Sequence, residues 1–188
     1  NSLFQTNSRG GGIRVTLNTI FTLTNNIVAG NSANTSGSGF AAFESNAVLV
    51  IHNTFAENTQ GDGSGVYIDS DIPVMLFNNV IVSQTMGILN ASPGIGSVNA
   101  SHTIYENNGT DHSAGVASSF EYFGPANLGH MYHLLPGSNA IDNGTLFAWI
   151  LFDIDLDPRL IGLAPDLGAA EFSLNLWLPL LLNPLAAP

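Results

Sequence analysis

Cysteine and lysine are both absent from this sequence of 188 residues, and charged residues make up only 9% of it. Three arginines stand against 14 acidic residues, which gives a formal net charge of -11. A surface this acidic repels nucleic acid and anionic lipid, so neither is an expected partner. The lack of cysteine leaves the redox compartment open, because disulfides are only one way for a protein to persist outside the cell.

Long hydrophobic runs are also missing. The longest apolar stretch, residues 174–188, is short and is broken by Pro179 and Pro184, so we expect no transmembrane helix. What the chain has instead is 20 glycines and many asparagines, serines and threonines. Small polar turn residues between β-branched runs are typical of an all-β protein with many tight bends. The length fits a single domain.

Several residue types recur in phase along the chain. Glycine followed by an apolar residue occurs at Gly12-Ile13, Gly39-Phe40, Gly65-Val66, Gly87-Ile88 and Gly115-Val116. A carboxamide column runs through Asn7, Asn31, Asn58, Gln84 and Asn107. Three residues before each carboxamide is an apolar residue: Phe4, Val28, Phe55, Ile81 or Ile104. Five residues before it is a polar residue expected at a bend: Ser2, Asn26, Asn53, Asn79 or His102.

A unit this short cannot bury its own apolar face, so successive units must stack on one another. The repeats therefore predict an all-β parallel β-helix of about five to seven coils, with an irregular C-terminal extension. Like residues then lie above one another, which gives amide ladders and aliphatic stacks. Alternate side chains of each strand point inward. The set expected to do so before the bend is Thr22/Thr24, Leu49/Ile51, Met75/Phe77 and Val98/Ala100.

Particular segments carry a family resemblance. Gly10-Gly11-Gly12-Ile13 and residues 24–31 resemble right-handed parallel β-helix repeats of the pectate-lyase-like type. Residues 133–144, 157–159 and 166–172 resemble the closing segment of bacterial choice-of-anchor surface proteins. The resemblance implies a right-handed, secreted β-helix held at a cell surface by a C-terminal device. We expect coils over residues 1–117, a closing segment over 118–173, and an apolar interface or anchoring tail over 174–188.

The sequence gives less support for a catalytic function than for a non-catalytic one. Polysaccharide lyases on this fold need an arginine or lysine base near carboxylates that hold calcium, and neither residue occurs between Arg14 and Arg159. A glycoside hydrolase needs only two carboxylates. Asp69 and Asp71 are expected on one face of a strand, with Asp62 in the preceding loop. Exposed acids in turns explain these residues equally well, so the sequence favours a non-catalytic protein.

Calcium is the one cofactor that the sequence suggests. Asp153, Asp155 and Asp157 alternate, and in an extended segment their carboxylates would share one face. An EF-hand would need a glycine where Pro158 stands, and a solvated loop is the simpler alternative. His130 and His133 hint at a metal site, but they lack a partner carboxylate at helical spacing, and a loop histidine pair is the simpler interpretation. His52 and His102 fit the bends, where structural roles suffice.

Five asparagines begin Asn-x-Ser/Thr sequons, which are candidate glycosylation sites: Asn34, Asn90, Asn99, Asn108 and Asn143. Asn34 and Asn108 fall in predicted surface loops, where a glycan would be tolerated.

Three functions remain open, of which the sequence favours the first. It is an extracellular, non-catalytic structural β-helix that associates with copies of itself, end to end in a filament. The repeats already fill residues 2–7, so we expect the open first coil to be covered by upstream residues or by another copy. The residues expected to mediate self-association are Leu3, Phe4, Trp177, Leu178, Leu180, Leu181 and Leu182. The second function is a glycan-binding or adhesive domain that uses exposed aromatics such as Tyr67 and Tyr105, and the third is a glycan-cleaving enzyme that uses Asp69 and Asp71.

Overall fold

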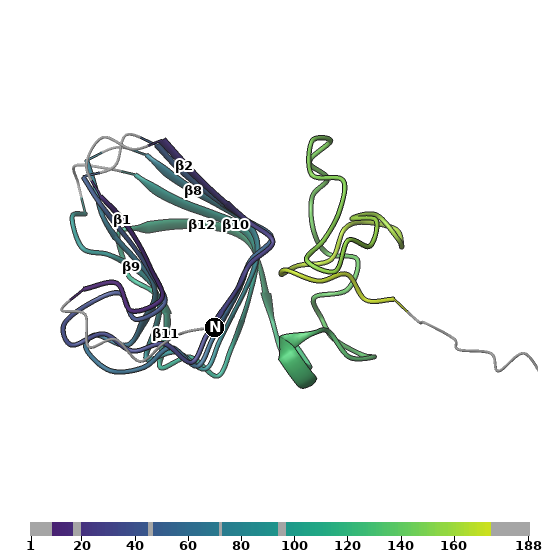
Figure 1. Cartoon of the computed structure of the whole chain (residues 1–188), viewed down its shortest axis with the longest axis horizontal. Coiled ribbons are helices and arrows are strands. Elements are labelled where there is room, and N and C mark those ends of the chain that lie inside the picture. The colour runs from purple at the N-terminus through teal and green to yellow at the C-terminus, as the bar shows by residue number, and fades with distance from the viewer. Residues whose placement is uncertain (1–8, 17–19, 45–46, 72, 94–96, 174–188) are drawn as a thin grey trace, which may run out of the picture.

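The structure is a computed structural model that describes residues 9–16, 20–44, 47–71, 73–93 and 97–173. The chain is all-β, with 47% of its residues in strands and parallel sheets stacked as a β-solenoid of about four turns. Figure 1 looks along the stack of coils, which overlap one behind another, and shows the irregular C-terminal segment beside one flank. The parallel β-helix predicted from the repeats is therefore confirmed, although the described part contains fewer turns than expected.

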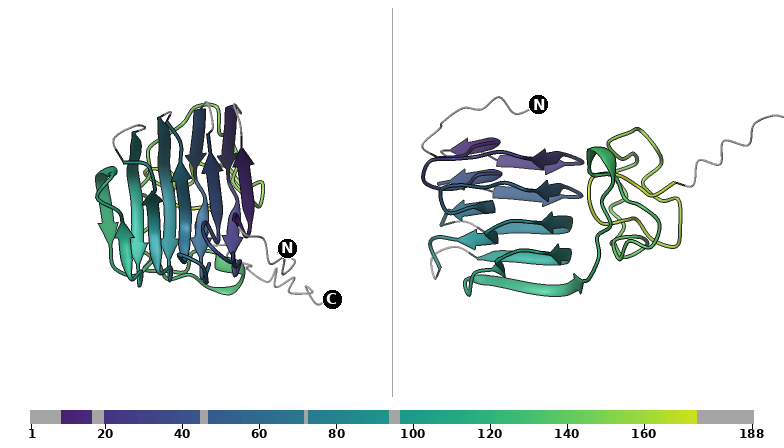
Figure 2. Two further views of the ribbon diagram at one scale, coloured as in Figure 1. Left: turned by 90° about the vertical axis from the view of Figure 1, so that its left-hand side faces the viewer. Right: turned by 90° about the horizontal axis from the view of Figure 1, so that it is seen from below.

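Two parallel sheets form the walls of the coils, which Figure 2 shows stacked edge on. The first sheet has the strand order β1 (Ile13–Thr16), β4 (Phe40–Phe43), β7 (Ser64–Asp69), β9 (Met86–Asn90), β11 (Thr110–His112). The second has the order β12 (Val116–Phe123), β10 (Val98–Glu106), β8 (Val74–Val82), β5 (Ala47–Ile51), β2 (Ile20–Thr24). Two short strands, β3 (Ile27–Ala29) and β6 (Thr54–Ala56), pair with each other, and β6 pairs with the second half of β8.

Sharp corners with left-handed backbone bend each coil. The first corner column is Asn25, His52, Asn78, His102 and Phe120, with φ between 50° and 56°. The second is Gly30, Glu57, Ser83 and Asn107, with φ between 54° and 65°. Asparagine and glycine tolerate this conformation best, and they occupy four of these nine corner positions.

Buried carboxamides next to these corners form two hydrogen-bonded ladders. In the first, the Asn79 side chain accepts from the backbone N–H of Asn53, and the Asn53 side chain accepts from that of Asn26. The second ladder runs in the same way through Asn31, Asn58, Gln84 and Asn108. Each bond of this kind adds about 1 kcal/mol to stability, and its loss would leave buried backbone groups unpaired.

The fourth coil corrects the predicted columns by one residue. Asn79 pairs with Thr103 and Ile81 with Tyr105. The residues in the bend, apolar and amide columns are therefore Thr103, Tyr105 and Asn108, not His102, Ile104 and Asn107. His102 instead occupies the left-handed corner, where a polar side chain can turn away from the core.

Two further predictions about the coils are wrong. Val116 pairs with Val98 in the second sheet, and His112 follows Ile88 in the first, so Gly115-Val116 does not open a fifth repeat. The inward residues before the bend form an aliphatic stack: Leu23, Val48, Val50, Val74, Leu76, Val98 and Ala100. Of the predicted inward set, Val98 and Ala100 are right. The other members were placed on the wrong face, because a shift of one residue reverses a strand's faces. Their columns run through Thr22, Leu49, Met75 and Asn99, and through Thr24, Ile51, Phe77 and Ser101.

The apolar core has two parts. One fills the interior of the coils. The other lies between the coils and the C-terminal segment, where Val80 and Ile104 pack with Leu134 and Leu167. The expected end of the coils was residue 117, but β12 remains paired with β10 as far as Phe123. The division of the chain into three units otherwise stays a prediction. Within the described residues, no helix is long and apolar enough to span a membrane.

Candidate functional site

A buried contact between a guanidinium and a carboxyl group attaches the C-terminal segment to the first corner column. Arg159 is 1% exposed, and its Nη1 lies 3.0 Å from Oε1 of Glu171. Its Nη2 donates to Oδ1 of Asn25 at 2.7 Å and to the carbonyl of Ala169 at 2.7 Å. The guanidinium therefore connects the corner at Asn25 to residues 168–171 of the closing segment.

Burial also shifts the titration of the groups around this pair. It raises the pKa of Glu171 to about 8, with Asp166 adding to the rise and Arg159 opposing it. It lowers the pKa of His52 to about 3, with help from Arg159. The neutral imidazole places Nδ1 3.1 Å from the carbonyl of Asp166 and Nε2 2.9 Å from Nδ2 of Asn78. Because these side chains are enclosed, we interpret the cluster as a structural attachment rather than a reaction centre.

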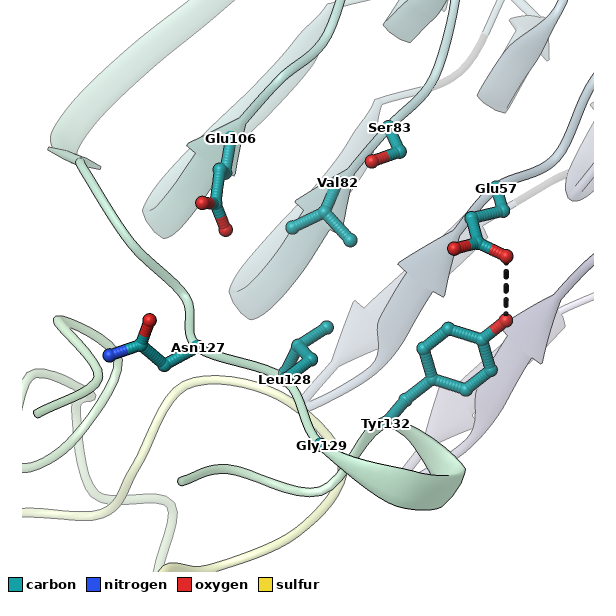
Figure 3. A pocket seen from close by; sticks show the side chains of 8 residues that line it. All are labelled: Glu57, Val82, Ser83, Glu106, Asn127, Leu128, Gly129 and Tyr132. Atoms are coloured by element: carbon teal, nitrogen blue, oxygen red, sulfur yellow. Dashed lines mark hydrogen bonds between the residues drawn. The ribbon is translucent and has the colours of Figure 1, made fainter. Parts of the chain in front are cut away.

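A polar cleft opens between the second corner column and the segment around residues 124–133 (Figure 3). Its volume is about 350 Å³, and its lining residues are Glu57, Val82, Ser83, Glu106, Asn127, Leu128, Gly129 and Tyr132. We call it the Glu57–Glu106 cleft. It combines two acidic side chains from the coils with an aromatic ring from η1 (His130–Tyr132).

The two carboxylates of the cleft are each held by one oxygen. Tyr132 donates its hydroxyl to Oε2 of Glu57 at 3.0 Å, and the backbone N–H of Ala126 donates to Oε2 of Glu106 at 2.9 Å. Burial raises the pKa of Tyr132, and the bond to Glu57 raises it further. The phenol therefore remains a hydrogen-bond donor, and each carboxylate keeps its Oε1 for another partner.

The loops of the C-terminal segment expose many large apolar side chains. Trp149, Leu151, Phe152 and Leu156 line one shallow cleft of about 380 Å³. We call these four residues the C-terminal apolar surface. Other exposed apolar residues accompany them in the same loops: Leu146, Ile154, Leu160, Ile161 and Leu163.

The predicted catalytic acids do not share a strand face. Asp69 is the last residue of β7 and accepts a hydrogen bond from Oγ of Ser92 at 2.5 Å, whereas Asp71 is exposed beyond the end of the strand. Asp62 accepts from the backbone N–H groups of Gly37 and Ser64, which shapes the loop. A catalytic role for Asp69 and Asp71 stays a prediction without the geometry on which it was based.

The acidic run that suggested calcium is a turn rather than an extended segment. Oδ1 of Asp153 accepts from the backbone N–H groups of Asp155 and Asp157, and its Oδ2 accepts from that of Glu171. Asp155 pairs with Nε2 of His133 at 2.6 Å. Among the residues that the structure describes, no group of three or more His, Asp or Glu side chains is placed to hold a metal ion. Calcium binding stays a prediction.

The sequons differ in exposure. Asn34 is exposed. The side-chain amides of the other four donate to groups within the chain: Asn90 to Gly115, Asn99 to Ser97, Asn108 to Ile81 and Asn143 to Asn139. Glycosylation stays a prediction at all five, and Asn34 is the position where a glycan would displace least.

The aromatics predicted to bind glycans are not both available. Tyr105 is 2% exposed, since the one-residue shift of the fourth coil turns it into the core. Tyr67 is half-buried against Phe43, with ring centroids 5.3 Å apart. The expected self-association residues all lie outside the described residues: Leu3, Phe4, Trp177, Leu178, Leu180, Leu181 and Leu182.

Sequence reasoning missed the Glu57–Glu106 cleft. Glu57 stands one residue before the amide column, at a corner where the first coil has Gly30, and this was the one local signal. Tyr132 and Leu128 come from an irregular segment whose position no repeat encodes.

The fold and these surfaces define the class of protein: a parallel β-solenoid closed along one flank by an irregular segment that exposes apolar side chains. Comparison of the chain with protein-family models, curated proteins and solved structures gave no match. The predicted resemblance is therefore confirmed only as a fold. Membership of the pectate-lyase-like or choice-of-anchor families stays a prediction.

Proposed function

We propose that this protein is a non-catalytic structural β-solenoid, located outside the cell or at its surface, that assembles with copies of itself through the C-terminal apolar surface. The observation that carries the proposal is the exposure of large apolar side chains that share one cleft. Contiguous exposed apolar surface of this kind marks interaction sites. The resemblance to secreted surface proteins supports the location.

Leu156 gives the sharpest support. Its side chain is 77% exposed and its backbone has φ of 69°, a conformation that costs a leucine about 1 kcal/mol or more. Neither burial in this chain nor backbone preference accounts for a leucine there. Contact with a second copy would bury it and contribute about 1.5 to 3 kcal/mol for each such side chain.

The low charge of the chain suits association through apolar contacts. Only 9% of residues are charged, although the net charge of -11 makes two copies repel each other. Added salt screens this repulsion, so assembly through apolar contacts should strengthen with ionic strength.

Sedimentation velocity of the full chain over a wide concentration range tests the proposal. We expect the wild type to form species heavier than the 19.7 kDa monomer as concentration and salt increase. Leu156→Asn removes the apolar side chain and suits the left-handed backbone, so it should shift the protein toward monomer, as should Trp149→Ser.

The matched control is Ile20→Asn, which removes an apolar side chain of 79% exposure from β2. It should leave assembly unchanged. A wild type that stays monomeric at high concentration and salt would overturn the proposal. Loss of assembly in Ile20→Asn with retention in Leu156→Asn would move the contact from the C-terminal apolar surface to the coils.

A further inference from the structure

The Glu57–Glu106 cleft is negative at both ends and apolar in the middle. Ala56 pairs with Val82, and Val82 pairs with Glu106, so three adjacent coils meet here. Strands of neighbouring coils lie about 4.8 Å apart, which places the backbones of the two glutamates about 10 Å apart. Figure 3 shows the side chain of Val82 between the two carboxylates, with Leu128 on the facing side of the cleft.

No positive group of the described chain balances these carboxylates. Of the three arginines, Arg159 is buried against Glu171, and Arg9 and Arg14 lie over the ring of Phe43. None of them lines the cleft. With a net charge of -11, the whole molecule also attracts cations toward this cleft.

The left-handed backbone at the corner positions Glu57 at the edge of the cleft. Glu57 has φ of 55°, and the matching position of the first coil is Gly30. A glutamate is not required for the corner to form. Tyr132 donates to Oε2 of Glu57 and turns its ring toward the same space, where an aromatic face can also attract a cation.

We propose that the Glu57–Glu106 cleft binds a short linear aliphatic chain with an ammonium group at each end, as in a diamine or polyamine. One ammonium group donates to Oε1 of Glu57 and the hydroxyl of Ser83, and the other donates to Oε1 of Glu106. The methylene chain lies across Val82 and Leu128. The site is independent of self-association through the C-terminal apolar surface, which lies in other loops.

Isothermal titration of the full chain with putrescine, a linear diamine, at low ionic strength tests this inference. We expect one saturable site that weakens as salt is added. Butylamine carries a single ammonium group and should bind about tenfold more weakly or worse, because it loses one charge-assisted contact. Glu57→Gln and Glu106→Gln should each weaken putrescine binding by about tenfold or more.

Glu44→Gln is the matched control. Glu44 is also an exposed glutamate at a left-handed corner, with φ of 48°, but it does not line the cleft. This variant removes the same charge and should leave the affinity unchanged within about twofold. Circular dichroism of each variant checks that the coils remain folded.

Three results would overturn the inference. The first is the absence of saturable putrescine binding by the wild type. The second is an equal loss of affinity in Glu44→Gln and Glu57→Gln, which would indicate attraction by the general surface charge. The third is equal affinity for butylamine and putrescine, which would exclude a site with two charged ends.

Discussion

The guanidinium of Arg159 lies 3.0 Å from the carboxylate of Glu171, and both side chains are 1% exposed. The pair lies between the coil corner at Asn25 and the turn at Gly168 and Ala169, so it joins the closing segment to the solenoid. Removal of the guanidinium leaves the surrounding acidic groups, which include Asp153 and Asp166, buried without their counter-charge, and such a loss is strongly destabilising.

Arg159→Met should therefore destabilise the protein strongly. We expect a loss of about 3 to 5 kcal/mol in the free energy of unfolding, because the acids around Glu171 lose their counter-charge. Chemical denaturation followed by circular dichroism measures it. Arg14→Met is the control, since Arg14 is exposed over the ring of Phe43 and should cost less than about 1 kcal/mol. Equal stability of the two variants would contradict a role for Arg159 in attachment.

Stability should fall as the solution becomes alkaline. The pKa of Glu171 is raised from 4.5 to about 8 by burial. Between these values the folded state keeps the proton that the unfolded state has lost, so Glu171 makes the free energy of unfolding decrease as pH rises. Asp166 contributes in the same direction, because burial raises its pKa as well. His52 acts in the opposite direction below pH 6.5, because its buried imidazole has a pKa of about 3, so the net decrease is expected between about 6.5 and 8.

Glu171→Gln removes this titration and should reduce the fall of melting temperature with pH between about 6.5 and 8. Melting curves of the variant and wild type, recorded across this interval, provide the comparison. Glu44→Gln, on the exposed corner, should keep the wild-type slope. If the slope of Glu171→Gln matched that of the wild type, Glu171 would not be the group responsible.

Substitution by alanine should reduce stability by different amounts at Gly39 and at Gly30. A Cβ at Gly39 would collide with the carbonyl oxygen of Gly65 in the next coil and approach the side chain of Asn58. Gly39→Ala must therefore separate two stacked strands, and we expect a loss of about 3 kcal/mol.

A Cβ at Gly30 would meet nothing within 4 Å, and its φ of +65° is the only obstacle. Gly30→Ala should cost about 1 kcal/mol. The two variants are compared by their midpoints in urea. A milder effect at Gly39 than at Gly30 would mean that the coils can separate without loss of stability.

Much of the solenoid could be predicted because its information is local and repeated. Each coil places like residues above like, so the amide column at Asn31, Asn58 and Gln84 shows in the sequence before any contact is known. The prediction failed in the fourth coil, where polar residues at His102 and Thr103 both fit a bend. Only the pairing of the whole of β8 with β10 selects between them.

The candidate functional surfaces could not be predicted from the repeats. The Glu57–Glu106 cleft is formed by residues from three coils and a ring from η1. The buried Arg159 donates a hydrogen bond to Asn25, which lies 134 residues earlier in the chain. The sequence alone determined that the chain stacks into a parallel β-solenoid, because that follows from the period of its apolar and amide residues. Only the tertiary structure decided which charges are buried and which face a cleft, since the irregular segment after Phe123 has no period and is positioned by packing against the coils.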